Sequence, residues 1–254
     1  MQRKITIEVC CGSVSDAVEA QRGGADRVEL NSGIMFGGLT PSAGAIIEAK
    51  RRLNIPIMVM IRPREGGFCY SEEELSVMEE DIKMALSCGA DGIVFGALKE
   101  DGQVDEEKCK RLIELCKDKE VVFHRAIDVV PDVFKALDKL ISLGIKRVLT
   151  KGQENSLEEG WKLIREMVNY CGNRLEILPG GVKLHNVDEY LPKLGCNQIN
   201  IASFIPQIDS SVSKRSHVYF GAASKNIEDR YNLIDESFVR SIRNTADNVK
   251  NDIV

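Results

Sequence analysis

Strand-like and helix-like segments alternate along the whole chain of 254 residues. Short β-branched and apolar runs predict strands, and longer segments with apolar residues at helical spacing predict the helices between them. The predicted strands are 5–10, 27–31, 56–63, 92–97, 121–128, 147–150, 174–178 and 198–203, and the predicted helices are 14–22, 42–53, 72–87, 105–117, 131–143, 157–171, 186–194 and 236–250. Strict alternation indicates parallel strands, because a parallel connection needs a crossover of helix length.

An internal repeat favours a closed barrel over an open sheet. Gly24, Gly89, Gly144 and Gly195 each follow a predicted helix and lead through a short polar link into an even-numbered strand. An open doubly wound sheet usually carries a glycine-rich nucleotide loop after its first strand, and Cys11-Gly12-Ser13 is not one. We therefore predict the α/β class and a single TIM (β/α)8 barrel domain over residues 1–254.

The segment 204–235 does not fit the alternation. It separates the last strand from the last helix and shows no strong periodicity. A connection of this length is usually a lid, an arm or an oligomer contact, and the alternative is a disordered excursion. Val218-Tyr219-Phe220 forms an apolar patch in an otherwise polar stretch, so we expect the segment to contribute to a homodimer.

Composition excludes several classes of partner. The net charge is -5 and no basic stripe occurs, which argues against nucleic acid. No apolar run is long enough for a membrane span, and the first residues lead into a strand without a signal-peptide core. We expect a cytoplasmic protein. Its eight cysteines then predict free thiols rather than a disulfide framework.

Polar side chains gather at the carboxyl ends of the predicted strands, where barrels bind ligands. Period-two alternation turns Glu8 and Cys10 into the barrel, and likewise Glu29 and Asn31. The fifth strand runs into His124-Arg125-Ala126-Ile127-Asp128, with His124 and Asp128 on the inner face and Arg125 on either side. The predicted mouth contains Glu8, Cys10, Glu29, Asn31, Arg62, Arg64, His124, Arg125, Asp128, Thr150, Gly180 and Gly181.

Two interpretations of this cluster stay open. In the first, the groups only satisfy one another, with Glu8 and Glu29 paired to Arg62 and Arg125, because buried charges persist only when paired. In the second, they bind a ligand, because the ionisable groups exceed what packing needs.

The ligand interpretation predicts an enzyme acting on a small anionic substrate. His124 is the natural general acid or base, and Glu8, Glu29 or Asp128 would assist it or orient its ring. Arg62 and Arg64 could clamp a carboxylate or phosphate. Gly180-Gly181 follows the seventh strand, where many barrels bind phosphate, although such a pair is often only a turn. Arg125 and Thr150 complete the predicted substrate contacts.

A metal interpretation depends on sulfur. Cys10 is the thiol expected inside the mouth, while Cys11 should point to the opposite face of the strand. Thiolates favour Cu(I) or Zn, and no spacing supplies the four ligands of a closed structural zinc site.

Several motifs together resemble the CutC family of copper-homeostasis proteins. They are Glu8-x-Cys10, Gly23-Gly24-Ala25-Asp26-Arg27-x-Glu29-Leu30, Gly37-Gly38-x-Thr40-Pro41-Ser42, Met60-Ile61-Arg62-Pro63-Arg64, Gly89-Ala90-Asp91-Gly92-x-Val94-Phe95-Gly96-Ala97-Leu98, Phe123-His124-Arg125-Ala126-x-Asp128 and Pro179-Gly180-Gly181. The resemblance covers nearly the whole chain and implies a TIM-type barrel, a cytoplasmic location and a role in copper handling.

One position departs from the family pattern. Members proposed to bind copper tend to carry a second cysteine after Glu-Leu on the second strand, and here that position is Asn31. Three hypotheses follow: a copper-homeostasis protein with Cys10 as its metal ligand and Cys11 or His124 as additional candidates, an enzyme for a small anion using His124, and a scaffold that works through the 204–235 segment.

Overall fold

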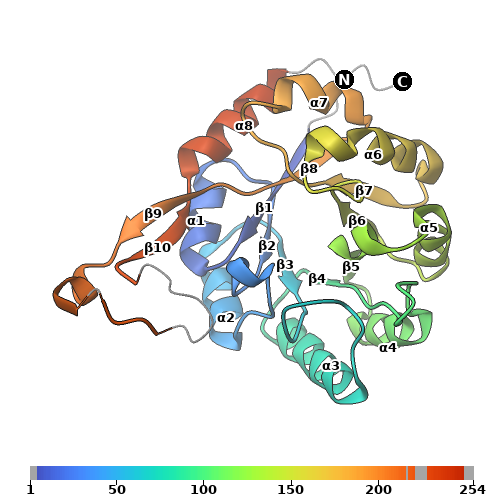
Figure 1. Cartoon of the computed structure of the whole chain (residues 1–254), viewed down its shortest axis with the longest axis horizontal. Helices are drawn as coiled ribbons and strands as arrows, with labels where there is room; N and C mark the ends of the chain where they lie inside the picture. The colour runs from blue at the N-terminus through green and yellow to red at the C-terminus, as the bar shows by residue number, and fades with distance from the viewer. Residues whose placement is uncertain (1–4, 216, 221–227, 249–254) are drawn as a thin grey trace.

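Eight parallel strands form a nearly closed barrel at the centre of the computed structural model, which describes residues 5–215, 217–220 and 228–248. The strands are β1 (Thr6–Cys11), β2 (Arg27–Leu30), β3 (Ile57–Met60), β4 (Gly92–Phe95), β5 (Glu120–Phe123), β6 (Arg147–Thr150), β7 (Glu176–Pro179) and β8 (Gln198–Ile201). Eight α-helices surround them (Figure 1). The predicted TIM barrel is confirmed.

The helices are α1 (Val14–Arg22), α2 (Ala43–Arg52), α3 (Glu72–Ser87), α4 (Glu106–Cys116), α5 (Val133–Ser142), α6 (Leu157–Cys171), α7 (Val187–Leu194) and α8 (Glu236–Asn248). Oxygen-bearing side chains begin the first six of them, because the N-cap residue accepts a hydrogen bond from an otherwise unpaired amide of the first turn. These caps are Ser13, Ser42, Ser71, Asp105, Asp132 and Ser156. Glu74 completes the predicted capping box at Ser71. None of the helices within the described ranges is long and apolar enough to cross a membrane.

The barrel closes between β7 and β8 by few main-chain contacts. β7 ends in Pro179, which has no N–H to donate to a ladder. A single parallel bridge joins Val182 to Ile201 just beyond it. Gln198 Nε2 also donates to Glu176 Oε2 at 3.3 Å. Side chains therefore contribute to the closure of the sheet.

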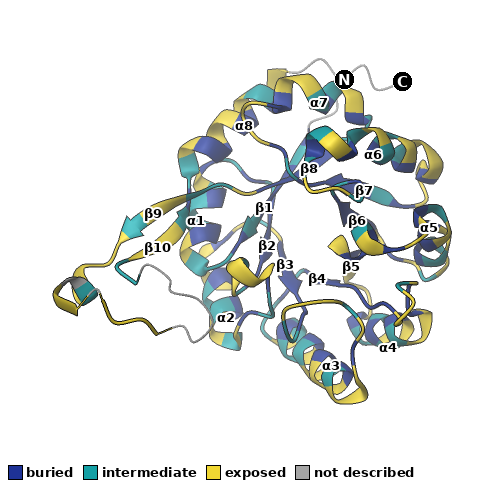
Figure 2. Ribbon diagram, in the orientation of Figure 1, coloured by how far each residue is buried: buried dark blue, intermediate teal, exposed yellow. Residues whose placement is uncertain are grey.

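The inside of the barrel is divided into an apolar and a polar side. Met58, Met60, Val94 and Val122, from β3 to β5, form a small apolar cluster separate from the main core. The main core lies between the strands and the helices, and the central strands are almost wholly buried (Figure 2). Charged and amide side chains of β1, β2, β6, β7 and β8 fill the other side.

A buried ion pair organises the polar side. Glu8 lies in register with Arg27 on β2 and with Asn200 on β8. Arg27 Nε donates to Glu8, Arg27 Nη2 donates to Gln198 Oε1 at 2.7 Å, and Asn200 Nδ2 donates to Glu8 Oε1 at 2.8 Å. The expectation that Glu8 would meet Arg62 is therefore wrong, because register brings Arg27 to it first.

The fifth strand is shorter than expected. It ends at Phe123, and residues Arg125–Val129 form a 3-10 helix, η2, for which His124 is the N-cap. Period-two alternation stops at this point. The expectation that His124 and Asp128 share an inner face is consequently wrong, since a 3-10 turn carries Asp128 toward the end of β6.

The segment between β8 and α8 contains an antiparallel ribbon that the sequence did not predict. β9 (Phe204–Ile208) pairs with β10 (Arg230–Ile234), and η3 (Ser210–Arg215) follows β9. The ribbon extends away from the barrel (Figure 1). Ile234 N donates to Asp16 Oδ1 at 2.7 Å and so fixes the base of the ribbon to α1. Residues 216 and 221–227 of the segment lie outside the described residues.

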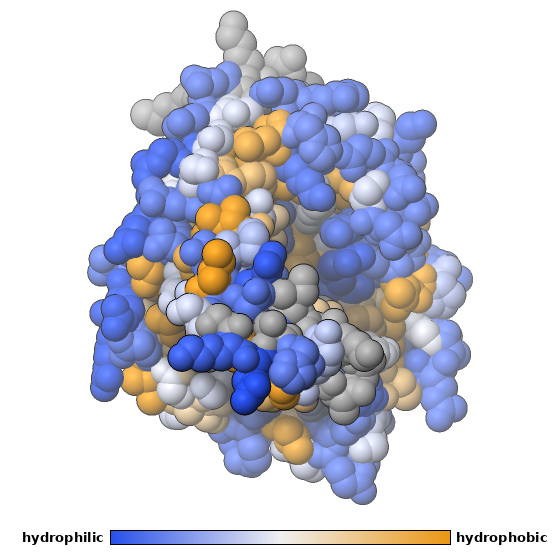
Figure 3. Space-filling model, turned by 60° about the vertical axis from the view of Figure 1, so that its left-hand side comes forward, coloured by the Kyte–Doolittle hydropathy of each residue, from blue (hydrophilic) through white to orange (hydrophobic). Residues whose placement is uncertain are grey.

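Apolar side chains of this segment are exposed. Ile208 is 81% exposed, Phe220 73% and Tyr231 56%. On the side of the molecule where the ribbon comes forward, hydrophobic side chains form separate patches among hydrophilic ones (Figure 3). A two-stranded ribbon that buries so little apolar surface gains little stability by itself.

The buried pair predicts a marked loss of stability when one partner is removed. Arg27→Met leaves the Glu8 carboxylate buried and unpaired, and we expect the free energy of unfolding to fall by about 3–5 kcal/mol. The double variant Glu8→Leu/Arg27→Met should be less destabilised than the single variant, because no charge is left unpaired. Urea denaturation measures both.

Lys83→Met is the matched control, because Lys83 pairs with Glu80 on an exposed helix surface. It should change the free energy of unfolding by less than about 1 kcal/mol. An Arg27→Met variant as stable as this control would contradict the role given to the buried pair.

Candidate functional site

A cavity of about 330 Å³ opens at the carboxyl ends of the strands. Of the predicted mouth residues it brings together Cys10, Glu29, Asn31, Arg62, His124, Arg125, Gly180 and Gly181. The other lining residues are Gly37, Met60, Phe68, Leu149, Lys151, Val182, Lys183, Asn200 and Ala202. This volume is enough for a small metabolite, and the mixture of apolar walls with a few polar groups is usual for ligand sites.

Four predicted residues lie outside the cavity lining because other partners hold them. Glu8 is held by Arg27 below the mouth. Arg64 pairs with Glu74 and donates to the carbonyls of Glu65, Gly67 and Cys69. Thr150 Oγ1 donates to Asp128 Oδ1. The carboxylate of Asp128 also accepts from the backbone N–H groups of Lys151 and Gln153, so it fixes the loop after β6.

His124 lines the cavity with a buried imidazole. Its Nδ1 accepts a hydrogen bond from Ala126 N at 3.1 Å, and its Nε2 is buried without a hydrogen-bond partner. Burial, with the positive charge of Arg62, lowers the pKa of His124 to about 3, so the imidazole is neutral near pH 7. Since Nδ1 is the acceptor, the single proton lies on Nε2. Neither Glu8 nor Asp128 orients the ring; the backbone of Ala126 does.

A glycine makes room for this histidine. A Cβ on Gly96, at the end of β4, would lie 2.6 Å from His124 Nδ1. On the other side Phe68 packs against the imidazole with ring centroids 4.8 Å apart. His124 is therefore held in one orientation by close packing and one hydrogen bond.

Arg62 fixes the loops around the mouth by donating hydrogen bonds to their carbonyl groups. Nη1 donates to the carbonyls of Phe36 and Gly38 at 2.8 and 3.0 Å, and Nη2 donates to Gly66 O at 2.7 Å. Its Nε is buried without a partner. Arg62 thus fixes two loops at the wall of the cavity, and its guanidinium also acts on the hydroxyl of Tyr70, instead of forming the two-pronged clamp expected from the sequence.

Glu29 supplies the unpaired acceptor of the site. Its Oε1 is buried without a hydrogen-bond partner, and the nearby Cys10, Asn31 and Asn200 side chains favour the charged form of the carboxylate. Burial, with the negative charge of Glu8, raises the pKa of Glu29 to about 7. A carboxyl group that titrates near neutrality can accept or release a proton there.

Cys10 and Asn31 lie side by side. Cys10 is half-buried, and Asn31 Nδ2 lies 3.5 Å from its sulfur. Burial and the charge of Glu29 raise the pKa of the Cys10 thiol well above its usual value. Cys11 is buried in the core between strands and helices, on the face opposite Cys10 as the alternation predicts. All eight cysteines are free.

Sequence reasoning did not find Lys151 and Lys183. Both line the cavity, one just after β6 and the other after Gly180-Gly181. They follow their strands in loops, where strand alternation no longer predicts direction. The sequence feature that could have identified them is their position directly after the ends of the sixth and seventh strands, where barrel loops carry binding residues.

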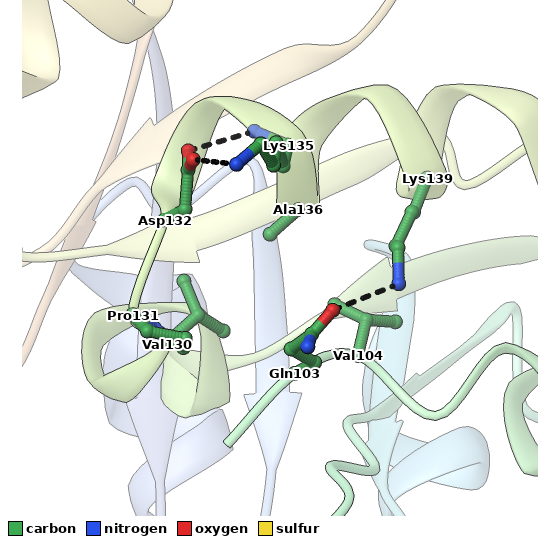
Figure 4. A pocket seen from close by; sticks show the side chains of 8 residues that line it. All are labelled: Gln103, Val104, Val130, Pro131, Asp132, Lys135, Ala136 and Lys139. Atoms are coloured by element: carbon green, nitrogen blue, oxygen red, sulfur yellow. Dashed lines mark hydrogen bonds and ion pairs between the residues drawn. The ribbon is translucent and has the colours of Figure 1, made fainter. Parts of the chain in front are cut away.

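A second cavity, of about 220 Å³, lies between the loop before α4 and the start of α5 (Figure 4). Its polar groups are already paired: Asp132 with Lys135, and Lys139 with Gln103 and Glu106. Outer grooves elsewhere are larger, at about 450 and 560 Å³. The mouth differs from these because it alone among them is lined by Glu29 and His124, each of which has a buried polar atom without a partner among the described residues.

Comparison with known proteins gives a consistent result. The model of the CutC family matches residues 5–205. A CutC family protein of Treponema denticola is 46% identical over 89% of this chain and 93% of its own length. The human copper homeostasis protein cutC homolog is 41% identical over 96% of this chain and 89% of its own. A crystal structure of a Streptococcus agalactiae protein described as the copper homeostasis protein CutC has a TM-score of 0.74 at 36% identity, covering 78% of this chain and 98% of that one.

Proposed function

Because the chain belongs to the CutC family, we propose that it acts in copper homeostasis and that Cys10 supplies the sulfur that contacts the ion. The observation that carries the proposal is the position of Cys10. It is the one cysteine, among the residues that the structure describes, that lines the mouth cavity. Copper is the cargo in this proposal and not a resident cofactor.

The described residues do not form a closed metal site. No group of three or more His, Cys, Asp or Glu side chains is placed to hold an ion within the described part of the chain. Tight Cu(I) sites favour more than one soft ligand, and the neighbour of Cys10 is the amide of Asn31. The raised pKa of the Cys10 thiol adds the cost of losing a proton. We infer weak, exchangeable copper binding.

We also infer a cytoplasmic location. Eight free thiols suit a reducing compartment, in which structural disulfides are rare.

The 204–235 segment is the proposed contact with a second copy of the chain. Its support is the projecting ribbon and the exposed apolar side chains on both sides of the β9–β10 turn, among them Ile205, Ile208 and Tyr231. Joining two such surfaces would remove this apolar area from water, which the ribbon alone does not do.

A second sulfur beside Cys10 should strengthen copper binding. Asn31→Cys places a thiol next to Cys10, so we expect its affinity for Cu(I) to rise by about an order of magnitude or more, as when a second soft ligand is added. Competition with a chromophoric Cu(I) chelator under anaerobic, reducing conditions measures the affinities of wild type, Cys10→Ser and Asn31→Cys.

Cys69→Ser is the control, because Cys69 is exposed and lies outside the cavity lining. Wild-type affinity in Cys10→Ser, or a reduced affinity in Cys69→Ser alone, would refute the assignment of the sulfur. One tight equivalent of copper in the wild type, unchanged in Asn31→Cys, would refute the inferred weak site.

Removal of residues 207–232 should convert a dimer to a monomer. The barrel should remain intact by circular dichroism, because the base of the ribbon at Ile234 is kept. Ile208→Lys/Tyr231→Lys should weaken association in the full-length chain by placing charge in the contact. Light scattering at micromolar concentration gives the mass.

Val77→Lys, on the exposed surface of α3, is the control for added charge and should leave the dimer unchanged. A wild-type monomer at this concentration would rule out the proposed contact.

A further inference from the structure

We propose that the mouth cavity binds a small phosphorylated carbonyl or hydroxy compound, with its phosphate beside Lys151 and Lys183 and its other end against His124 and Arg62. This ligand site is independent of the copper proposal, because none of these four residues is a sulfur ligand. Two groups of contacts, at the rim and at the floor of the same cavity, carry the inference.

The rim is cationic. Arg125, Lys151 and Lys183 all line the cavity. Burial, together with the positive charges of Arg125 and Lys183, lowers the pKa of Lys151, so both neighbours act on its ammonium. Asp128 offsets part of this charge through Arg125, at 2.8 Å. No described acidic side chain forms an ion pair with Lys151 or Lys183. A phosphate dianion is the small group that best balances such a cluster.

The backbone of the loop after β7 lies close to the Lys151 side chain at this rim. Gly180 and Gly181 bear no side chains, and the stem of Lys151 lies directly against them. A Cβ on Gly180 would lie 3.6 Å from Lys151 Cγ, and one on Gly181 would lie 3.6 Å from Lys151 Cε. Gly181 also has φ of 86°, which a side chain would disfavour. A Cβ at either position would make only ordinary contact with Lys151, so the backbone of Gly181 is what calls for glycine, and Lys151 Nζ is held at the rim by donating to Asn155 O at 3.3 Å.

Three residues that line the cavity carry buried polar atoms without hydrogen-bond partners. His124 Nε2–H and Arg62 Nε–H are donors, both side chains are more than nine-tenths buried, and neither atom has a partner in the described protein. Unsatisfied buried donors are rare because each has lost its hydrogen bonds to water without a replacement. A carbonyl or hydroxyl oxygen of the ligand would accept from them, and the unpaired Glu29 Oε1 would accept from a ligand hydroxyl. A bare anion cannot satisfy both ends.

Isothermal titration calorimetry with dihydroxyacetone phosphate, ribose 5-phosphate and fructose 6-phosphate tests the site, with inorganic phosphate, dihydroxyacetone, ribose and fructose as partial probes. We expect at least one sugar phosphate to bind at least tenfold more tightly than inorganic phosphate and than its parent sugar. Lys151→Met and Lys183→Met should each weaken that binding about tenfold or more, which is the effect expected for loss of a charge-assisted contact. Lys83→Met, far from the mouth on α3, should change it less than twofold.

His124→Phe distinguishes the contribution of the floor to binding from that of the rim. It keeps a ring and removes the Nε2–H, so it should weaken the sugar phosphate while leaving inorganic phosphate unchanged; its melting temperature without ligand reports whether the variant folds. Failure of every sugar phosphate to bind more tightly than inorganic phosphate would overturn the proposal. Equal affinities for the Lys151→Met, Lys183→Met and Lys83→Met variants would overturn it as well, whatever the result with His124→Phe.

Discussion

The buried pair of Glu8 and Arg27 is the interaction on which the polar half of the barrel depends. Neither charge can stay unpaired in the interior, and Asn200 and Gln198 complete their hydrogen bonds from β8. The same network continues through Glu176 on β7, where main-chain pairing with β8 is sparse. Side-chain hydrogen bonds thus help to close a sheet that Pro179 interrupts.

Closer to the mouth than this network, buried polar atoms of Glu29, Arg62 and His124 have no hydrogen-bond partner among the described residues. Burial raises the pKa of the Glu29 carboxyl group, and the negative charge of Glu8 adds to this shift. Arg62 donates three hydrogen bonds to the loop carbonyls of Phe36, Gly38 and Gly66 and none to Glu29, and its Nε is buried without a hydrogen-bond partner. The result is a floor with both donors and an acceptor, next to a single half-buried thiol. Copper and an organic ligand would use different atoms of one cavity.

Much of this arrangement could be predicted from sequence. Strict alternation predicted the barrel, and period two placed Glu8 and Cys10 inside and Cys11 outside. Alternation failed where the strand ended: the 3-10 turn after Phe123 redirected Asp128, and the loop residues Lys151 and Lys183 had no predicted direction. Arg27 was missed because the pairing of Glu8 depends on strand register across the sheet, which one sequence does not reveal. The β9–β10 ribbon was missed because exposure on both faces removes the usual alternation of apolar and polar residues.

The central claim is that burial, and not pairing with a carboxylate, sets the protonation state of His124 in the mouth. The ring is neutral and carries its proton on Nε2. A proton–nitrogen correlation spectrum of the imidazole groups tests it most directly, with His124→Gln to assign the signal among the three histidines. The account predicts a neutral ring with a protonated Nε2 and an unprotonated Nδ1 from about pH 8 down to about pH 5, because the usual pKa of about 6.5 is strongly lowered. An imidazolium at pH 6, or a proton on Nδ1, would contradict it.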